Sequence, residues 1–314
     1  MEKKIATREA YGQALKKFGA DKKIVVLDAD LSKSTKTELF QKEYPDRFIN
    51  CGIAEGNMMA VAAGLATCGK TVFASSFAMF AALRAFEQIR NSICYPKLNV
   101  KVVASHAGVT VGEDGATHQC LEDLGIMRTL PNMVVINPAD AVETEKAIRA
   151  AIDWQGPMYI RVGRAAVPVL FDDSYDFRIG KGVTVRDGKD VTVAATGIMV
   201  NEALIAAQTL AEKGIDVRVV NISTIKPIDR EIIEKAARET GAIVTAEEHN
   251  INGGLGSAVS EVLAETFPAP MERVGTLDVF GCSGKPQELM EKYHLTANDI
   301  IQKTQTVLAR KTKA

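Results

Sequence analysis

The sequence lacks the features that mark several classes of protein. It contains five cysteines in 314 residues, and no two of them form a CxxC pair. Its longest apolar runs are too short to cross a bilayer, and its N-terminus has no apolar core of a signal peptide. The formal net charge of −1 gives no basic field that would attract nucleic acid or an anionic membrane. We therefore expect a cytoplasmic protein with reduced thiols, and with neither nucleic acid nor membrane as a partner.

The sequence does have a regular alternation of two patterns. Short β-branched runs, such as IVVLDAD at 24–30, alternate with helical patterns along most of the chain. This alternation predicts an α/β fold with two doubly wound domains, each a parallel sheet covered by helices. Residues 165–190 break the alternation, and we expect a linker with a short hairpin there. The predicted organisation is a first domain at 1–170, a linker at 171–190 and a smaller α/β domain at 191–314.

Two of the four histidines flank one glycine-rich loop. The stretch ASHAGVTVGEDGATHQ, residues 104–119, places Glu113 and Asp114 between His106 and His118. It follows a predicted strand, and the ligand crevice of an open α/β sheet lies beyond the carboxyl ends of the strands. Acids and histidines together suit hydrogen bonding to a polyhydroxylated ligand, or proton transfer. The alternative is that the histidines only satisfy loop carbonyls.

Other predicted strands end at the same edge of the sheet, which could bring Asp30, Glu55, Phe77 and Phe80 to this loop. Glu55 is a lone carboxylate at the start of an apolar helix. It either shares a proton with a ligand or is a favourable charge in the first helical turn. A long helix is predicted over 78–95. Phe77 and Phe80, at the start of this stretch, are three residues apart and would share one helical face. They either pack in the core or form a platform for a flat heteroaromatic ring.

Isolated polar residues suggest further binding functions. Arg8, Arg161 and Arg164 could grip a phosphate, with help from Ser34, although surface arginines are usually only solvated. A metal site formed by this chain alone is not expected. His118 and Cys120 are one residue apart, but no second close pair of cysteine or histidine completes a ligand set.

Several stretches together resemble the C-terminal half of transketolase. They occur in the order of that family and cover nearly the whole chain, and GEDGATHQ followed by LPNM and PAD is highly specific. The matching stretches are ATREA at 6–10, DADLSKST at 28–35, GIAEGNM at 52–58, FASSFAMF at 73–80, SHAGVTVGEDGATHQ at 105–119, RTLPNMVVINPADAVE at 128–143, RVGRAAVP at 161–168 and VTVAATG at 191–197. The resemblance implies a pyrimidine-binding domain followed by a transketolase C-terminal domain.

The resemblance also implies how a cofactor is bound. Glu55 would hydrogen-bond N1′ of the aminopyrimidine of thiamine diphosphate, Phe80 would stack on that ring, and Phe77 would lie beside it. Two positions depart from the family. Gly56 stands where a larger polar residue is usual, and Leu83 stands where relatives often carry an aromatic, so we expect a less aromatic pocket.

The implied reaction is transfer of a two-carbon ketol unit from a ketose phosphate to an aldose phosphate, in the pentose phosphate pathway. His106 and Asp114 would bind hydroxyls of the donor sugar, and His118 the reacting oxygens. The residues implied to hold the terminal phosphate are Arg8, Ser34 and Arg164. Together with Glu55, the two histidines would be the catalytic residues.

The family's diphosphate- and metal-binding domain, with its Gly-Asp-Gly motif and downstream asparagine, has no counterpart in this sequence. The resemblance therefore implies a split transketolase, with an N-terminal partner subunit that carries the ligands of Mg²⁺ or Ca²⁺. Two such pairs would form a heterotetramer. The alternatives are a 1-deoxyxylulose-5-phosphate synthase-like subunit, a 2-oxo acid dehydrogenase beta-type subunit and a non-catalytic regulatory subunit. His106 and the GEDG sequence disfavour the first, and the second has no need of a histidine pair that binds sugar hydroxyls. The combination of Glu55, His106 and His118 disfavours the third.

Overall fold

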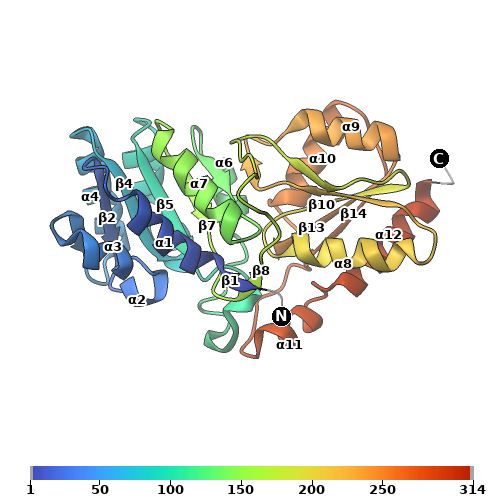
Figure 1. Ribbon diagram of the computed structural model, residues 1–314, viewed down its shortest axis with the longest axis horizontal. Coiled ribbons are helices and arrows are strands. Elements are labelled where there is room, and N and C mark those ends of the chain that lie inside the picture. Colours follow the sequence, from blue (N-terminus) through green and yellow to red (C-terminus); the bar gives the residue numbers. More distant parts are fainter. Residues whose placement is uncertain (1–2, 312–314) are drawn as a thin grey trace.

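A computed structural model describes residues 3–311 and shows two α/β lobes that lie side by side (Figure 1). The first sheet runs from the N-terminal part of the chain into its middle, and the second sheet belongs to the C-terminal part. A short antiparallel ribbon joins β1 (Lys4–Ala6) to β8 (Ala166–Pro168). The predicted α/β class with two domains is confirmed.

Within the described residues, the first lobe contains a seven-stranded sheet. In spatial order its strands are β12 (Thr224–Lys226), β6 (Val134–Ile136), β7 (Met158–Arg161), β5 (Val100–Ser105), β4 (Thr71–Phe77), β2 (Ile24–Asp28) and β3 (Phe48–Asn50). All neighbours are parallel except β12, which runs antiparallel to β6. Since β12 follows β11 (Val217–Asn221) of the second lobe in the chain, the second lobe contributes an edge strand to the first sheet.

Helices cover both faces of this sheet. The helical segments of the first lobe are α1 (Thr7–Phe18), α2 (Ser32–Thr35), α3 (Glu38–Glu43), η1 (Pro45–Arg47), α4 (Glu55–Thr67), η2 (Met79–Arg84), α5 (Phe86–Gln88), η3 (Ile89–Cys94), η4 (Val109–Asp114), α6 (Asp123–Thr129) and α7 (Ala141–Asp153). Along β2, Val25 and Leu27 join the core on the α4 side, whereas Ile24 and Val26 join the core on the side of α1 and α7. A strand that is buried on both faces explains the continuous apolar run in the sequence.

The long helix predicted over 78–95 is not a single regular α-helix. Two π-helical segments, η2 and η3, flank the short α5. Ala81, Ala82 and Ala85 are fully buried, so the backbone of this region lies close against the core. Wide π turns often occur at functional sites, because they change the direction in which side chains leave a helix.

The second lobe contains a five-stranded sheet within the described residues. Its strands in spatial order are β14 (Met271–Thr276), β13 (Ile243–Asn250), β10 (Val191–Ala195), β11 (Val217–Asn221) and β9 (Val183–Arg186). Its helices are α8 (Met199–Ala211), α9 (Arg230–Thr240), α10 (Leu255–Glu265), α11 (Pro286–Lys292) and α12 (Ala297–Lys311). The hairpin expected within 165–190 does not form, because β8 pairs with β1 and β9 pairs antiparallel with β11.

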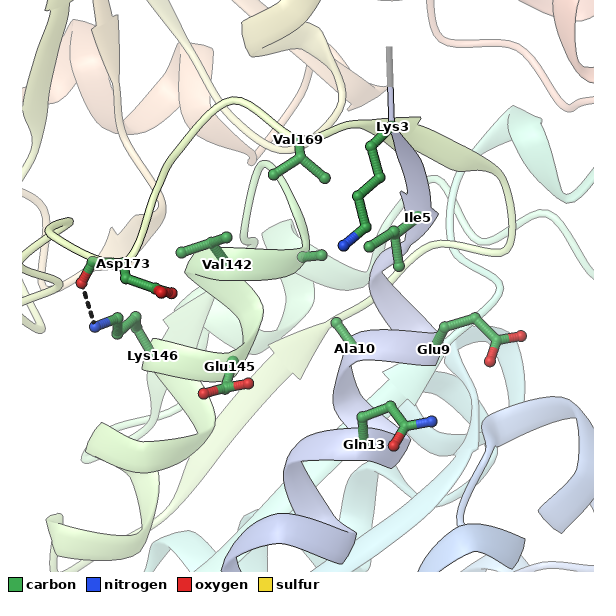
Figure 2. A pocket seen from close by; sticks show the side chains of 11 residues that line it. Lys3, Ile5, Glu9, Ala10, Gln13, Val142, Glu145, Lys146, Val169 and Asp173 are labelled. Carbon is green, nitrogen blue, oxygen red and sulfur yellow. Dashed lines mark hydrogen bonds between the residues drawn. The ribbon is translucent and has the colours of Figure 1, made fainter. Parts of the chain in front are cut away.

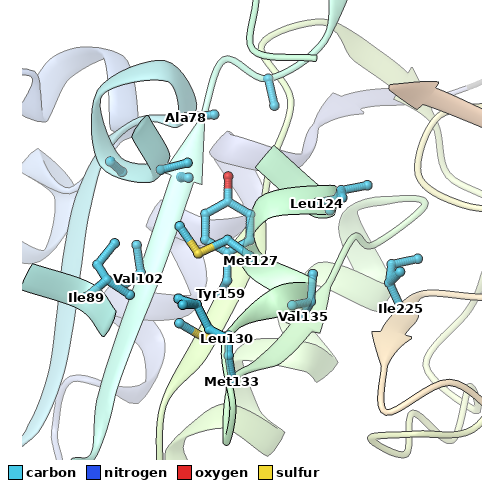
Figure 3. Close-up of a cluster of buried hydrophobic side chains, with 14 of the residues drawn as sticks. Ala78, Ile89, Val102, Leu124, Met127, Leu130, Met133, Val135, Tyr159 and Ile225 are labelled. Atoms are coloured by element: carbon cyan, nitrogen blue, oxygen red, sulfur yellow. The ribbon is translucent and has the colours of Figure 1, made fainter. Parts of the chain in front are cut away.

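The apolar core is continuous between the lobes. Leu124, Met127 and Val135 of the first lobe belong to the same buried cluster as Ile225 of β12 (Figure 3). The edge strand therefore brings apolar side chains as well as backbone hydrogen bonds. Such a shared core holds the lobes in one relative orientation.

Three further findings hold for the described residues. No helix among them combines the length and the apolarity that a membrane span needs. No group of three or more histidines, cysteines or acids among them could hold a metal ion. All five cysteines are free thiols.

Candidate active site

The first sheet gathers the predicted site residues at one edge. β2, β4 and β5 are parallel neighbours, so the loops that follow them leave the sheet on the same side. Nine residues gather around this edge: contacts described below connect seven of them, and Arg164, which pairs with Asp114, is close enough for its charge to act on His106. The nine residues are Arg8, Ser34, Glu55, Phe77, Phe80, His106, Asp114, His118 and Arg164.

The two phenylalanines and the two histidines form one aromatic cluster. Phe77 ends β4, so the expectation that it shares a helical face with Phe80 was wrong. Its ring stacks on His106, with ring centroids 3.9 Å apart, and on Phe80, with centroids 5.9 Å apart. His118 meets the Phe80 ring edge-on, with centroids 5.4 Å apart. Phe80 is only partly buried, so its ring can contact a planar ligand.

His106 is buried and neutral. Burial, with the nearby charges of Arg8 and Arg164, lowers its pKa to about 3. Nη1 of Arg8 approaches Nε2 of His106 at 3.2 Å, and a guanidinium can only donate. Nε2 is therefore the acceptor, and the single ring proton lies on Nδ1, which donates to Oγ of Ser105 at 2.9 Å. The backbone of His106 has a φ of 57°, a left-handed conformation that few non-glycine residues adopt.

Glu55 begins α4, and only 1% of its surface is exposed. Its Oε2 accepts a hydrogen bond from Nη1 of Arg84 at 2.9 Å. The Arg84 guanidinium also lies over the Phe80 ring, 4.7 Å from the centroid. No sequence pattern described above predicted Arg84, although its position four residues after Phe80 lets the two side chains meet along a helical segment. Arg84 links the buried carboxylate to the aromatic cluster.

Arg8 lies in the first turn of α1 and connects two loops. Besides His106, its Nη1 donates to the carbonyl oxygen of Ser34 at 2.9 Å. Its Nε is buried and has no hydrogen-bond partner within the described residues. An unpartnered guanidinium nitrogen at this edge suits an anionic ligand.

Asp28 fixes the segment that carries Ser34, a function that the sequence analysis did not assign to it. Its carboxylate accepts hydrogen bonds from the N–H of Leu31 at 2.6 Å, the hydroxyl of Thr35 at 2.7 Å and the hydroxyl of Thr37 at 2.9 Å. Asp28 is fully buried, and burial raises its pKa despite these bonds. The turn that follows β2 is therefore held from inside the sheet.

Arg164 lies just after β7 and faces the acidic part of the histidine loop. Its Nη1 donates to the carbonyl of Val111 and lies 3.5 Å from a carboxylate oxygen of Glu113 and 3.7 Å from one of Asp114. Both acids are exposed. Such exposed pairs contribute little to stability, so these groups remain free to exchange partners with a ligand.

Asp30 does not join this constellation. It is exposed, and its carboxylate accepts a hydrogen bond from the side-chain amide of Asn50 at 3.1 Å. The sheet therefore brings together the residues that the sequence suggested, with this exception.

A cavity of about 520 Å³ lies elsewhere, between α1, α7 and the β1–β8 ribbon (Figure 2). None of the nine site residues lines it. Its lining mixes apolar side chains with both signs of charge, such as Lys3 and Glu9, and Lys146 donates to the carbonyl of Asp173 at 3.0 Å. Its chemistry selects no particular class of ligand.

The residues around Glu55 fit one side of a heteroaromatic cofactor. A buried carboxylate can hydrogen-bond a protonated ring nitrogen, and the adjacent aromatic ring can stack on the heterocycle. The described residues contain no metal-ligand cluster that would hold a diphosphate through a divalent ion. The described residues thus offer a carboxylate and an aromatic ring that could hold a heterocycle, and guanidinium groups that could pair with a phosphate, but no cluster of metal ligands.

Comparison with known proteins gives consistent matches over the chain. Residues 3–169 match the family model of the transketolase pyrimidine binding domain, and residues 180–300 match that of the transketolase C-terminal domain. A Methanocaldococcus jannaschii protein, provisionally named as a transketolase C-terminal section, is 51% identical over 300 residues that cover 94% of each chain. Human transketolase is 41% identical over 312 residues, which cover 98% of this chain and 50% of that protein. The structure of a split gene transketolase, described as an inactive beta4 tetramer, aligns with a TM-score of 0.90 and 56% identity, covering 97% of this chain and 98% of that chain.

Proposed function

Because the chain belongs to the transketolase family and corresponds to the C-terminal section of a split transketolase, we propose that it transfers a two-carbon ketol unit between sugar phosphates. The donor is a ketose phosphate and the acceptor an aldose phosphate. The family generally uses thiamine diphosphate and a divalent metal, and we propose Mg²⁺ or Ca²⁺ here. When bound, thiamine diphosphate supplies the nucleophilic carbon to which the two-carbon unit is transferred.

The observation that carries this proposal is the constellation that joins Glu55, Phe80 and His106. Glu55 would hold a proton at N1′ of the aminopyrimidine, and Phe80 with Phe77 would orient that ring. This requires Arg84 to share or release the Glu55 carboxylate. The buried, almost dry position of Glu55 strengthens such a hydrogen bond.

The substrate would lie between the histidine loop and the arginines. We propose that His106 and Asp114 bind hydroxyls of the donor sugar and that His118 holds the reacting oxygens. His106 presents an acceptor at Nε2, which suits a sugar hydroxyl once Arg8 turns toward the ligand. Arg8, Arg164 and Ser34 would bind the terminal phosphate, because guanidinium groups pair with phosphate through two donors.

We propose that the site is completed by an N-terminal partner subunit that holds the diphosphate and the metal. The chain spans half the length of human transketolase. Apolar side chains are also exposed beside the site: Ile53 is 78% exposed and Leu83 is 38% exposed. A partner that covers them would bury this surface, and two pairs would give a heterotetramer. Five free thiols agree with a cytoplasmic location.

Reconstitution tests the proposed function. Calorimetry of the lone chain with thiamine diphosphate and magnesium should show no binding at micromolar cofactor. The mixture with the N-terminal subunit should bind the cofactor and transfer a ketol unit from a ketose phosphate to an aldose phosphate. Stoichiometric cofactor binding by the lone chain would contradict the split site. Consumption of pyruvate in place of the ketose would refute the proposed reaction and indicate a deoxyxylulose phosphate synthase or a 2-oxo acid dehydrogenase instead.

A further inference from the structure

Two domains meet at the loop that carries the proposed substrate residues. β13 of the second lobe ends in the sequence Glu247-Glu248-His249-Asn250, and this end of the strand is buried against the first lobe. The N–H of Asn250 donates to the carbonyl of Leu121 at 2.8 Å, and the N–H of Gly125 donates to Nε2 of His249 at 3.2 Å. These contacts fix the strand end beside the histidine loop, without using any residue of the proposed site.

The side chain of Glu248 contacts the backbone of the histidine loop directly. It is 4% exposed, and its Oε1 accepts a hydrogen bond from the N–H of Thr110 at 2.7 Å. Gly108 precedes the η4 turn with a φ of +83°, and a Cβ at this position would lie 2.2 Å from the Glu248 carboxyl group. The carboxylate therefore occupies the space that only a glycine leaves free, at the N-terminal end of a helical turn whose N–H groups attract a negative charge.

A second group of the first lobe balances this buried acid. Nη2 of Arg161 donates to the backbone carbonyl of Glu248 at 2.9 Å, and its Nε donates to Asp123 at 2.9 Å. Burial raises the pKa of Glu248, while Arg161 and the Thr110 N–H act in the opposite direction. Glu248 is thus held by the first lobe at two points, its carboxylate by Thr110 and its backbone carbonyl by Arg161, although it belongs to the second lobe.

The η4 turn connects Glu248 to the ligand-binding residues. The turn begins three residues after His106 and ends at Asp114, and its Val111 carbonyl accepts a hydrogen bond from Arg164. A change in the position of the turn would move Asp114 and Arg164 relative to His106. We propose that Glu248 is a positioning residue, through which the second domain holds η4 in the geometry that binds the donor sugar phosphate. This inference rests on the proposed function for the identity of the ligand, and on geometry alone for the contact.

The test compares three variants of the full chain. Glu248→Leu removes the acceptor, whereas Glu248→Gln keeps an oxygen for the Thr110 N–H. Glu247→Leu is the matched control. Glu247 is buried in the same strand and accepts from the N–H groups of Leu255 and Gly256 at 2.7 and 2.8 Å, wholly within the second lobe.

The first readout needs no activity. Hydrogen exchange of the Thr110 amide should become about 10-fold or more faster in Glu248→Leu, since an unmade buried hydrogen bond costs roughly 1–3 kcal/mol. Exchange should stay near the wild-type rate in Glu248→Gln and in Glu247→Leu. Unchanged exchange in Glu248→Leu overturns the proposed contact, whatever the chain catalyses.

The second readout uses the complex reconstituted with the N-terminal subunit. We expect Glu248→Leu to raise KM for the ketose phosphate by about 10-fold, with a smaller change in kcat and unchanged affinity for thiamine diphosphate. Glu248→Gln should restore KM. An equal rise in KM in Glu247→Leu overturns the positioning function, because the effect would then be general destabilisation. Absence of ketol transfer in the wild-type complex would instead refute the proposed function and leave the exchange result standing.

Discussion

At the scale of single residues, the clearest prediction concerns the effect of replacing Glu55 on turnover. Glu55→Gln keeps the shape of the side chain but weakens proton sharing with a ring nitrogen. In the reconstituted complex we expect turnover to fall by about 10²-fold or more, the range typical of general acid–base groups. The matched control is Glu87→Gln, an exposed position on the neighbouring α5. Near-normal turnover of Glu55→Gln would remove Glu55 from the proposed chemistry.

His106 predicts a dependence of stability on pH. Its pKa in the folded chain is about 3, whereas an unfolded histidine has a pKa near 6.5. Between these values the unfolded state binds a proton that the folded state does not, so the free energy of unfolding falls as the pH falls through this window. The loss from this group should be about 1.6 kcal/mol between pH 6.5 and pH 5.

Urea unfolding of the wild type and of His106→Gln at several pH values measures this effect. The variant has no group to titrate at this position, so its stability should fall less steeply with acid. The difference between the two proteins should shrink by the amount given above as the pH decreases to 5. Parallel curves over the whole range would show that His106 takes up its proton in the folded state as easily as in the unfolded one.

At the scale of single elements, α7 depends on one buried aspartate. Asp140 caps the helix by accepting from the N–H of Glu143 at 2.8 Å, and its other oxygen accepts from the N–H groups of Leu170 and Phe171 at 2.7 and 2.9 Å. Asp140→Ala removes the cap and leaves two backbone donors of the inter-domain segment without their partner. We expect a loss of about 3 kcal/mol in the free energy of unfolding.

Denaturant unfolding of Asp140→Ala checks this expectation. The control is Asp153→Ala at the other end of α7, where the aspartate pairs with Arg149 on the exposed surface. That change should stay within about 0.5 kcal/mol of the wild type. Similar losses in both variants would mean that the cap and the two outer bonds of Asp140 contribute no more than a surface pair.

Helices and strands also show which features can be predicted from the sequence. Strand and helix alternation predicts both sheets, and the position of a loop after a strand predicts that His106 and Glu55 lie near one edge. Local patterns could not predict that β9 joins the second sheet, since its partner β11 lies some thirty residues away. Glu248 was missed for the same reason, because its partner Thr110 is distant in the sequence. The pairing of Arg84 with Glu55 is equally distant, although the position of Arg84 four residues after Phe80 was a local signal. Such pairs depend on the topology, which the local pattern does not contain.

At the scale of the whole molecule, the pairing of β12 with β6 lets us predict how a fragment without β12 would behave in solution. A fragment of residues 1–178 lacks β12 and leaves the edge of β6 unpaired, together with the apolar surface that Ile225 covers. An open edge of this kind pairs readily with other strands. We expect the fragment to self-associate with rising concentration in sedimentation velocity runs. A monomeric, cooperatively folding fragment would show that the first lobe needs no edge strand from the second.

The same strand bears on how such enzymes can be rearranged by recombination. A crossover after residue 169 and before residue 180 lies between the two matched family models, so in the sequence it separates the two domains without cutting either. The resulting chimera would nevertheless pair the β6 of one relative with the β12 of another, and these two strands have not evolved together. Chimeras between relatives should therefore tolerate an exchange of the second lobe only when residues 224–226 are inherited together with the β6 that they border.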